Sequence, residues 1–451
     1  MSDIIAAIAT GRAPCAIGIL RLSGPGCAAL TGRVFTPKQP FADAPDRRLV
    51  LGLLHDRQGR VIDECLGVVC RAPHSYTGEE TVELQCHGSP AMLAAGLEAL
   101  LAAGARQAGP GEFTRRAFLN GKLDLTQAEA VVDLIDAETA DAAANAAGQL
   151  GGALKRAIEP VYDGLTDLCS HFHAVLDYPD EDIEDFGAAE LSGALDRAGV
   201  ALRELLATYE KGRHLRQGVR AVLLGKPNAG KSSLLNRLAG YDRVIVTDIA
   251  GTTRDTVEEP VRVGRVLLRL TDTAGIREAG DAIEALGVAR SEQAAREAEL
   301  ALFVCDASQP LTDEDRRAIE AAKCAPRSLA LCNKSDLPAA VSPDALPFDT
   351  VLTVSARTGA GLDALPALLE GWFLGGNACD GSLLTNPRQF GALDRASRAI
   401  ERAKTGLGLG VTPDAVLTDV EEAMAALGEV TGRTVREDIT NRIFERFCVG
   451  K

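Results

Sequence analysis

The segment that most constrains the fold of this chain is GKPNAGKS at residues 225–232. It fits the pattern G-x-x-x-x-G-K-[ST], which functions only between a buried strand and a helix. The apolar run Val219–Gly225 predicts that strand, and a helical pattern follows the motif. In such a turn the backbone N–H groups and the positive end of the helix converge on phosphate oxygens. The segment therefore predicts an α/β sheet that carries a phosphate-binding loop.

Alternating strand and helix patterns extend this prediction to a doubly wound α/β domain over residues 215–375. The other buried strands are expected at Leu267–Thr271, Leu300–Cys305, Leu329–Asn333 and Val351–Ser355. The last helix of this domain is expected at Gly361–Phe373.

Several residues in this domain have the chemistry needed to hold a triphosphate and Mg²⁺. Lys231 can neutralise the β- and γ-phosphates, and Ser232 can bind the metal. Asp272, which opens the DTAG motif after a strand, can support the Mg²⁺ shell, and the Gly275 amide can sense the γ-phosphate. Thr253, in the segment GTTRD, is placed to complete that shell.

The NKSD motif at residues 333–336 predicts which base is bound. Asp336 can accept hydrogen bonds from N1–H and the exocyclic amine of guanine, whereas adenine would leave it unpaired. The backbone of the SAR segment at 355–357 can donate to guanine O6. Each motif alone is compatible with an ordinary loop of an α/β sheet. All five in this order predict a GTPase.

The residue after the DTAG motif is Ile276, where Ras-like GTPases have a glutamine that orients the attacking water. Isoleucine cannot do this, so another group must position water and balance the transition-state charge. The nearest carboxylates lie in the segment Arg277–Glu284.

The flanking residues predict two further kinds of domain. Residues 1–120 are expected to form a small α+β domain, with a hairpin turn at 57–60. Its strands and helix are expected at Ala16–Leu22, Leu49–Leu54, Gly67–Cys70, Thr81–Cys86 and Ala91–Ala103. Residues 121–214 and 376–451 are predicted to be helical, which favours one helical domain with the GTPase inserted into it. Three domains in series is the alternative.

Helix starts are suggested by two sequences of the capping-box type, Thr126–Glu129 and Thr418–Glu421. The first would open a long Ala-rich helical stretch that runs to Pro160 and resumes to about Leu176, and a further helix is expected at Ala188–Lys211.

Composition excludes some classes of protein. The net charge of −15 argues against a surface that grips nucleic acid over its whole extent, so any such contact must be local. The 11 cysteines are scattered without a C-x-x-C pair, so their spacing predicts neither a zinc site nor a redox dithiol, and favours a reducing cytoplasm. No apolar stretch approaches the ~20 residues of a membrane span.

The pieces GKPNAGKSSLLN, VTDIAGTTRD, DTAGIRE and NKSD, together with GEFTRRAFLNGKLDLTQAEAV, SYTGEETVELQCHG and the terminal FCVGK, closely resemble one family over nearly the whole chain. This is the family of tRNA-modifying GTPases called MnmE or TrmE. The resemblance implies a homodimer that works with the FAD-dependent protein MnmG on tRNA, without a membrane. Together they would add an aminomethyl or carboxymethylaminomethyl group to C5 of the wobble uridine.

For the GTPase domain, the resemblance implies activation by K⁺, which takes the place of an arginine finger. Glu284 matches the family's catalytic carboxylate, and Asn228, Thr247, Ile249 and Thr252 would supply K⁺ ligands. The motifs and the resemblance together predict nucleotide contacts from Asn228, Ala229, Gly230, Lys231, Ser232, Ser233, Thr247, Asp248, Ile249, Ala250, Gly251, Thr252, Asp272, Thr273, Ala274, Gly275, Asn333, Lys334, Asp336, Ser355, Ala356 and Arg357.

For the N-terminal domain, the resemblance implies binding of 5-formyltetrahydrofolate or a related folate, and formation of the dimer. Arg21, Glu83, Lys122 and the C-terminal Lys451 would contact the folate, and Cys448 is a candidate reactive thiol. The sequences GRAPCAIG and CHGS depart from the family pattern and affect the details of this pocket. The alternatives to this function are a ribosome-assembly GTPase and a purely regulatory switch.

Overall fold

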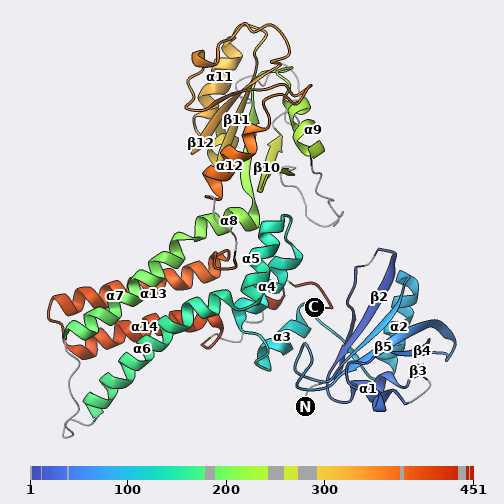
Figure 1. Cartoon of the computed structure of the whole chain (residues 1–451). Helices are drawn as coiled ribbons and strands as arrows, with labels where there is room; N and C mark the ends of the chain where they lie inside the picture. The colour runs from blue at the N-terminus through green and yellow to red at the C-terminus, as the bar shows by residue number, and fades with distance from the viewer. Residues whose placement is uncertain are drawn as a thin grey trace. The chain divides into compact units, whose positions relative to one another are not determined.

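We describe the protein from a computed structural model, drawn in Figure 1. The structure describes residues 3–11, 13–37, 40–177, 188–241, 258–272, 292–375, 380–434, 443–445 and 447–450. The chain divides into two compact units. Unit 1 contains residues 1–132, 149–191 and 398–451, and unit 2 contains residues 133–148 and 192–397. No helix in the described ranges has the length and apolarity of a membrane span.

Unit 1 begins with a seven-stranded sheet in the order β3-β4-β5-β6-β2-β1-β7. Neighbouring strands are antiparallel except β1 and β7, which are parallel. The strands are β1 (Ile5–Ile8), β2 (Cys15–Ser23), β3 (Phe35–Pro37), β4 (Val50–His55), β5 (Val61–Cys70), β6 (Thr81–Gly88) and β7 (Arg106–Gln107). The accompanying helices are α1 (Cys27–Thr31), the short 3-10 helix η1 (Phe41–Asp43), α2 (Pro90–Ala102) and α3 (Glu112–Leu119). The four predicted strands, the helix and the β4–β5 turn are confirmed.

One face of this sheet is buried because apolar side chains alternate along its strands. Leu20, Leu22, Leu54 and Leu84 are fully buried there, and they pack in one cluster with Leu93 of α2. The opposite face carries half-buried polar residues of β2 and β6.

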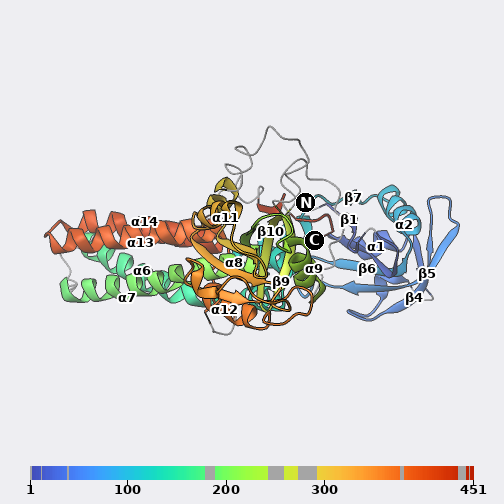
Figure 2. The ribbon, with the colours of Figure 1, turned by 90° about the horizontal axis from the view of Figure 1, so that it is seen from above.

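Helices follow in the chain. They are α4 (Leu125–Ile135), α5 (Ala140–Leu150), α6 (Ala153–Asp177), α7 (Ala188–Ala207), α8 (Tyr209–Gln217), α13 (Pro387–Gly408) and α14 (Pro413–Thr431). Within unit 1, α6 and α14 lie side by side (Figures 1 and 2). Cys169 Sγ of α6 is 3.4 Å from Met424 Sδ of α14.

Both predicted capping boxes are wrong in position. The first box is formed by Asp124 and Gln127: Gln127 N–H donates to Asp124 Oδ1 at 2.9 Å, and Asp124 N–H donates to Gln127 Oε1 at 3.0 Å. Aspartate caps a helix as well as threonine does, so the capping residue is Asp124, two positions before Thr126. Thr418 lies inside α14, which begins at Pro413 because proline fits the first helical position. Pro160 also lies inside α6 rather than interrupting it.

Unit 2 contains a six-stranded sheet in the order β13-β12-β11-β8-β10-β9. The strands are β8 (Val219–Leu224), β9 (Glu258–Val263), β10 (Val266–Asp272), β11 (Leu300–Asp306), β12 (Arg327–Asn333) and β13 (Val351–Thr353). All pairs are parallel except β9–β10. The helices that lie between its strands or after them are α9 (Lys231–Tyr241), α11 (Asp313–Ala322), α12 (Ala364–Phe373) and the 3-10 helix η3 (Pro343–Ala345).

Strands β8, β11 and β12 are mostly buried on both faces, and two apolar clusters cover the two sides. This is the pattern of a doubly wound sheet, as predicted from the sequence. Ligands of such sheets bind at the carboxyl ends of the strands. Strands β8, β11 and β12 all end beside the predicted nucleotide motifs.

Candidate nucleotide-binding site

The loop between β8 and α9 has a backbone that only glycine permits at two positions. Gly225 has φ +145°, and a Cβ there would lie 2.1 Å from the carbonyl oxygen of Val304. Gly230 has φ +98°, and its Cβ would lie 2.1 Å from Asn333 Nδ2. Asn228, at the exposed tip, has φ 60°. The close approach of β11 and β12 therefore leaves no room for a side chain at these two positions of the loop.

Lys231 begins α9 and extends back over this loop. Its Nζ donates to the carbonyl oxygens of Gly225 at 2.7 Å and Lys226 at 2.9 Å. Ser232 and Ser233 follow on the first helical turn, and both are exposed. The ammonium group and the first hydroxyl groups of α9 are thus placed at the same end of the helix, where its dipole favours anions.

Asn333, at the end of β12, holds two loops together. Its Nδ2 donates to the carbonyl oxygen of Ala229 at 2.9 Å, and its Oδ1 accepts from the N–H of Ala356 at 2.9 Å. The residue is 2% exposed. The structure brings the predicted phosphate loop and the predicted base loop to one site through this side chain.

Asp336 has both carboxylate oxygens engaged within the 333–357 region. Ser355 Oγ donates to Oδ1 at 2.6 Å, and Arg357 lies 2.8 Å from Oδ2. The hydrogen bond from Ser355 is the main reason that the pKa of Asp336 is below its ordinary value. The carboxylate is therefore held ionised, as acceptance from guanine requires.

Lys334, the second residue of the NKSD motif, has φ 65° and pairs with Asp306 at the end of β11. Its Nζ is 2.7 Å from Asp306 Oδ2. Burial alone would raise the pKa of Asp306, but hydrogen bonds from Lys334 and Ser308 outweigh it and lower that pKa. This ion pair fixes the side chain of Lys334 along the base loop.

The structure refines the expected donor to guanine O6. The N–H of Ser355 donates to the carbonyl oxygen of Ala360 at 2.9 Å, and the N–H of Ala356 donates to Asn333. Within the described residues, the N–H of Arg357 has no such acceptor. Of the three N–H groups expected to reach guanine O6, those of Ser355 and Ala356 already have acceptors.

Two structural contacts of the site were not anticipated from the sequence. Lys226 Nζ is 2.9 Å from Asp315 Oδ2, at the start of α11, where Asp315 also forms a capping box with Thr312. Arg237 of α9 donates to the carbonyl oxygen of Thr358 at 3.0 Å. The T-x-x-D pattern at Thr312 signals the cap, but nothing in the sequence signals its contact with Lys226.

The remaining predicted residues of this site are only partly described. Asp272 is the last residue of β10 and pairs with Leu223 of β8, at the same edge of the sheet as the phosphate loop. The predicted residues outside the described ranges are Thr247, Asp248, Ile249, Ala250, Gly251, Thr252, Thr253, Thr273, Ala274, Gly275 and Glu284.

A second group of predicted residues lies in unit 1. Arg21 Nε donates to Glu83 Oε1 at 2.8 Å across β2 and β6, and another nitrogen of Arg21 donates to the carbonyl oxygen of Gly450 at 3.2 Å. The guanidinium carbon is 5.8 Å from the ring centres of both Tyr76 and Phe113. The structure thus brings the end of the chain to the Arg21–Glu83 pair.

The other predicted residues surround this pair less directly. Lys122 Nζ donates to the carbonyl oxygen of Pro73 at 3.2 Å, in the loop that also carries Tyr76. Cys448 is exposed, and its carbonyl oxygen accepts from the N–H of Gly111 at 3.3 Å. Lys451 lies outside the described residues.

Comparison with known proteins gives matches over the whole chain. A family model for the "MnmE helical domain" matches residues 125–448, and one for the "GTP-binding protein TrmE N-terminus" matches residues 4–122. The tRNA modification GTPase MnmE of Roseiflexus sp. (strain RS-1) is 45% identical over 465 residues, which cover 100% of this chain and 99% of that protein. The protein of the same name from Aquifex aeolicus (strain VF5) is 41% identical over 454 residues, covering 100% of both.

Among solved structures, the G domain of the T. maritima FeoB iron transporter matches 33% of this chain and 94% of its own. It is 21% identical, with a TM-score of 0.25.

Proposed function

This chain belongs to the MnmE/TrmE family of tRNA-modification GTPases, and we propose from that premise that it hydrolyses GTP at the loop between β8 and α9. The observation that carries this proposal is the arrangement around Asn333. This buried side chain joins the phosphate loop to a base loop whose Asp336 is ionised and oriented. A purine nucleoside triphosphate can span the two loops only if its base satisfies that carboxylate, and guanine does so.

Nucleotide binding requires this chain's own side chains to exchange partners. Lys231 Nζ, now bonded to two loop carbonyls, turns to the β- and γ-phosphates. The Arg357–Asp336 ion pair opens or shifts, so that Asp336 accepts from guanine while Ser355 keeps its hydrogen bond. Arg357 can move because its side chain is 75% exposed.

The donors at this edge of the sheet fit Mg²⁺ and K⁺. The exposed Ser232 hydroxyl starts α9, and Asp272 ends the neighbouring strand, so both offer the oxygen ligands that Mg²⁺ prefers. Asn228 offers an oxygen at the exposed tip of the phosphate loop, as K⁺ binding requires. The other proposed ligands, Thr253 for Mg²⁺ and Thr247, Ile249 and Thr252 for K⁺, belong to the same proposal. When bound, the cations supply positive charge to the phosphoryl group being transferred.

We propose that Glu284 positions the attacking water, because Ile276 cannot. Its replacement by alanine should lower GTP turnover by about 10²-fold or more without weakening GTP binding, since general-base and positioning effects act in the transition state. Turnover of the Glu284→Ala protein at the wild-type rate would refute this role.

In unit 1, Arg21, Glu83 and Lys122 fit a folate. The ammonium of Lys122 suits the glutamate tail, the exposed Tyr76 can contact a planar pterin, and Arg21 orients Glu83 through the hydrogen bond between them. Glu83 can accept from pterin donors because its side chain is only partly buried. Lys451 would complete the site, since the carbonyl oxygen of Gly450 already lies against Arg21. Cys448 is accessible enough to react.

The full proposed activity follows from these two sites and the family. The homodimer acts with the FAD-dependent MnmG protein in the cytoplasm and adds a (carboxymethyl)aminomethyl group to C5 of the wobble uridine of tRNA, with folate as the one-carbon source. The cysteines of the described residues are all free, which is consistent with a reducing compartment.

GTP turnover measured in K⁺ and in Na⁺ buffer of equal ionic strength tests the hydrolytic part. We expect much faster turnover in K⁺, and Lys231→Ala should abolish it in both. Equal rates would contradict cation activation, and ATP held as tightly as GTP would contradict the guanine site.

Nucleoside analysis of tRNA after incubation with the protein and MnmG tests the modification. GTP turnover without modified uridine would favour a regulatory GTPase.

A further inference from the structure

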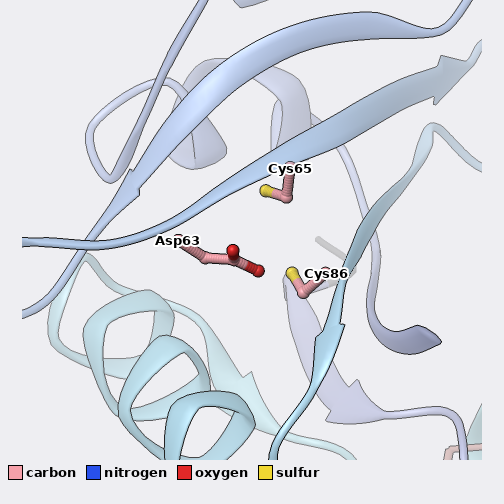
Figure 3. A group of neighbouring side chains, drawn as sticks. All are labelled: Asp63, Cys65 and Cys86. Carbon is pink, nitrogen blue, oxygen red and sulfur yellow. The ribbon is translucent and has the colours of Figure 1, made fainter. Parts of the chain in front are cut away.

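Three metal-ligating side chains meet in the N-terminal sheet, away from both sites described above. Asp63 and Cys65 lie on β5, and Cys86 lies on β6. A carboxylate oxygen and the two Sγ atoms all lie within 4.8 Å of one another. Figure 3 shows the two sulfur atoms and the carboxylate pointing toward a common space.

The register of the sheet explains why these residues meet. Leu66 pairs with Gln85 in the antiparallel β5–β6 ladder, so Cys65 stands opposite Cys86 on the next rung. Asp63 is two residues before Cys65 and therefore faces the same side of the sheet. The C-x-x-C spacing rule cannot detect such a group, because its two thiols come from different strands.

All three side chains are withdrawn from solvent. Cys65 and Cys86 are each 3% exposed, and the side chain of Asp63 is 8% exposed. A carboxylate in such surroundings needs compensation by hydrogen bonds or by positive charge.

A further layer of contacts orients the carboxylate. The backbone N–H of His87 donates to Asp63 Oδ2 at 2.8 Å, and His87 Nδ1 lies 2.7 Å from Asp63 Oδ1. Carboxylates that bind metals are commonly fixed by hydrogen bonds of this kind. Each carboxylate oxygen keeps a second lone pair, so Asp63 can accept hydrogen bonds from His87 and bind a cation at the same time.

We propose that Asp63, Cys65 and Cys86 form a Zn²⁺ site. Two thiolates and a carboxylate are the ligands that Zn²⁺ favours, with Zn–S near 2.3 Å and Zn–O of about 2.0–2.2 Å. Tetrahedral binding needs the two sulfurs about 3.8 Å apart, and the three ligand atoms now lie within 4.8 Å of one another. A water or an incoming donor takes the fourth position. Binding releases the two thiol protons to solvent and involves no oxidation or reduction.

Two other clusters in the described part of the chain lack these properties. Glu210, His214 and Glu299 of unit 2 are also close together, but the guanidinium of Arg213 already contacts both carboxylates. The thiols of Cys305 and Cys332 are 3.9 Å apart, and no third ligand in the described residues joins them.

The zinc would join β5 and β6 near the end of their ladder, on the buried face that packs against α2. Glu83 lies on the other face of β6, because odd and even residues of a strand alternate. The site is therefore separate from the Arg21–Glu83 pair, and we expect it to stabilise the N-terminal domain rather than to contact folate. The proposal does not depend on the proposed function.

The test measures zinc in the full-length protein after expression with zinc and removal of loosely bound metal. Elemental analysis should find close to one Zn²⁺ per chain in the wild type and in the matched controls Cys70→Ser, on the same strand, and Cys305→Ser. The variants Cys65→Ser, Cys86→Ser and Asp63→Asn should lose most of it. In the wild type, Co²⁺ in place of Zn²⁺ should give thiolate-to-metal charge-transfer absorption, which the Cys65→Ser protein should lack.

Circular dichroism and GTP turnover of each variant establish that it is folded. A strong chelator should lower the thermal midpoint of the wild type and leave that of Cys65→Ser unchanged. Absence of zinc and of the cobalt signal in the wild type would overturn the proposal. Zinc loss from Cys70→Ser equal to that from Cys65→Ser, or a Cys65–Cys86 disulfide in protein purified under reducing conditions, would do the same.

Discussion

The carboxylate of Asp336 is bonded within the protein and is also the proposed acceptor for guanine. Ser355 and Arg357 both contact this carboxylate, and the proposed hydrogen bonds from guanine would displace or be shared with one of them. We expect the hydrogen bond from Ser355 to persist when guanine binds, because it is the main cause of the lowered pKa of Asp336. We expect the ion pair with Arg357 to break instead, because it lies at the surface, where ion pairs contribute little to stability.

Asp336→Asn should change the base preference of the site from guanine to xanthine. An amide cannot accept both donors of guanine, and two lost charge-assisted hydrogen bonds should weaken GTP binding by about 10²- to 10⁴-fold. Xanthine carries a carbonyl where guanine has its amine, and the Asn N–H₂ can donate to it. Competition with a fluorescent guanine nucleotide measures both effects. Asp313→Asn, at an exposed helix start, should bind GTP normally, and unchanged GTP affinity in Asp336→Asn would disprove the assignment.

Ser355→Ala should make guanine binding more sensitive to acid. Removing the donor destabilises the charged carboxylate, so the pKa of Asp336 rises. Binding needs the ionised form; affinity is therefore retained above that pKa and lost as the pH falls through it. The loss in the variant should begin at a higher pH than in the wild type. Measuring GDP affinity against pH for both proteins tests this prediction. If the affinity of the two proteins fell over the same acidic pH range, the prediction would be contradicted.

Among elements, α11 supports the phosphate loop through one buried ion pair. Lys226 meets Asp315, whose side chain is 1% exposed and whose Oδ1 is a buried atom without a partner. Lys226→Met would leave this carboxylate with only its hydrogen bonds from Thr312. We expect a loss of roughly 2–3 kcal/mol in the stability of the GTPase domain, below the usual cost of breaking a buried pair because those bonds remain.

Lys323→Met is the matched control for this element. Lys323 pairs with Glu320 on the same helix at 3.0 Å, but both side chains are well exposed. Its replacement should cost under about 1 kcal/mol. Thermal or urea unfolding followed in the GTPase domain compares the two variants, and equal losses would show that the Lys226–Asp315 pair gives no special support.

The same scale shows what sequence patterns can predict. Strands with continuous apolar runs, such as β8 and β11, were predicted almost to their ends. The first half of β5 was missed, because Asp63 and Glu64 interrupt its apolar pattern, and the antiparallel β9 was missed because its residues are mixed in polarity. Motifs located the residues of the nucleotide site. Its bridges, from Asn333 to Ala229 and from Lys226 to Asp315, join residues about a hundred positions apart and appear only in the folded chain.

At the scale of the molecule, residues 444–450 pack against parts of unit 1 that lie more than 300 positions earlier in the chain. Val449 pairs with Pro110, and the carbonyl oxygen of Gly450 accepts from Arg21. Phe444 and Phe447 are buried in unit 1, in one apolar cluster with Ala128 and Val131 of α4. The Arg21–Glu83 pair therefore contacts a segment that lies 429 positions away along the chain.

Gly111, at the start of α3, lies where this C-terminal segment docks. It has φ +62°, and a Cβ would lie 2.7 Å from the carbonyl oxygen of Phe444 and 2.8 Å from Phe447 Cβ. Gly121 has a similar φ of +68°, but a Cβ there would meet nothing within 4 Å. Gly121→Ala should thus cost about 1–2 kcal/mol from backbone strain alone. Gly111→Ala should cost about 1–3 kcal/mol more, because backbone and a buried ring must move.

The difference between the two variants isolates the docking of the chain end. Gly111→Ala should increase hydrogen exchange and proteolysis in residues 443–450, because Gly450 then leaves Arg21, and it should weaken the proposed binding of folate. Gly121→Ala should leave the C-terminal segment protected, although it lowers the thermal midpoint. If folate affinity and C-terminal protection fell equally in both, strain in the N-terminal domain would explain the loss. The contact between the two ends of the chain would then have no part in forming the site.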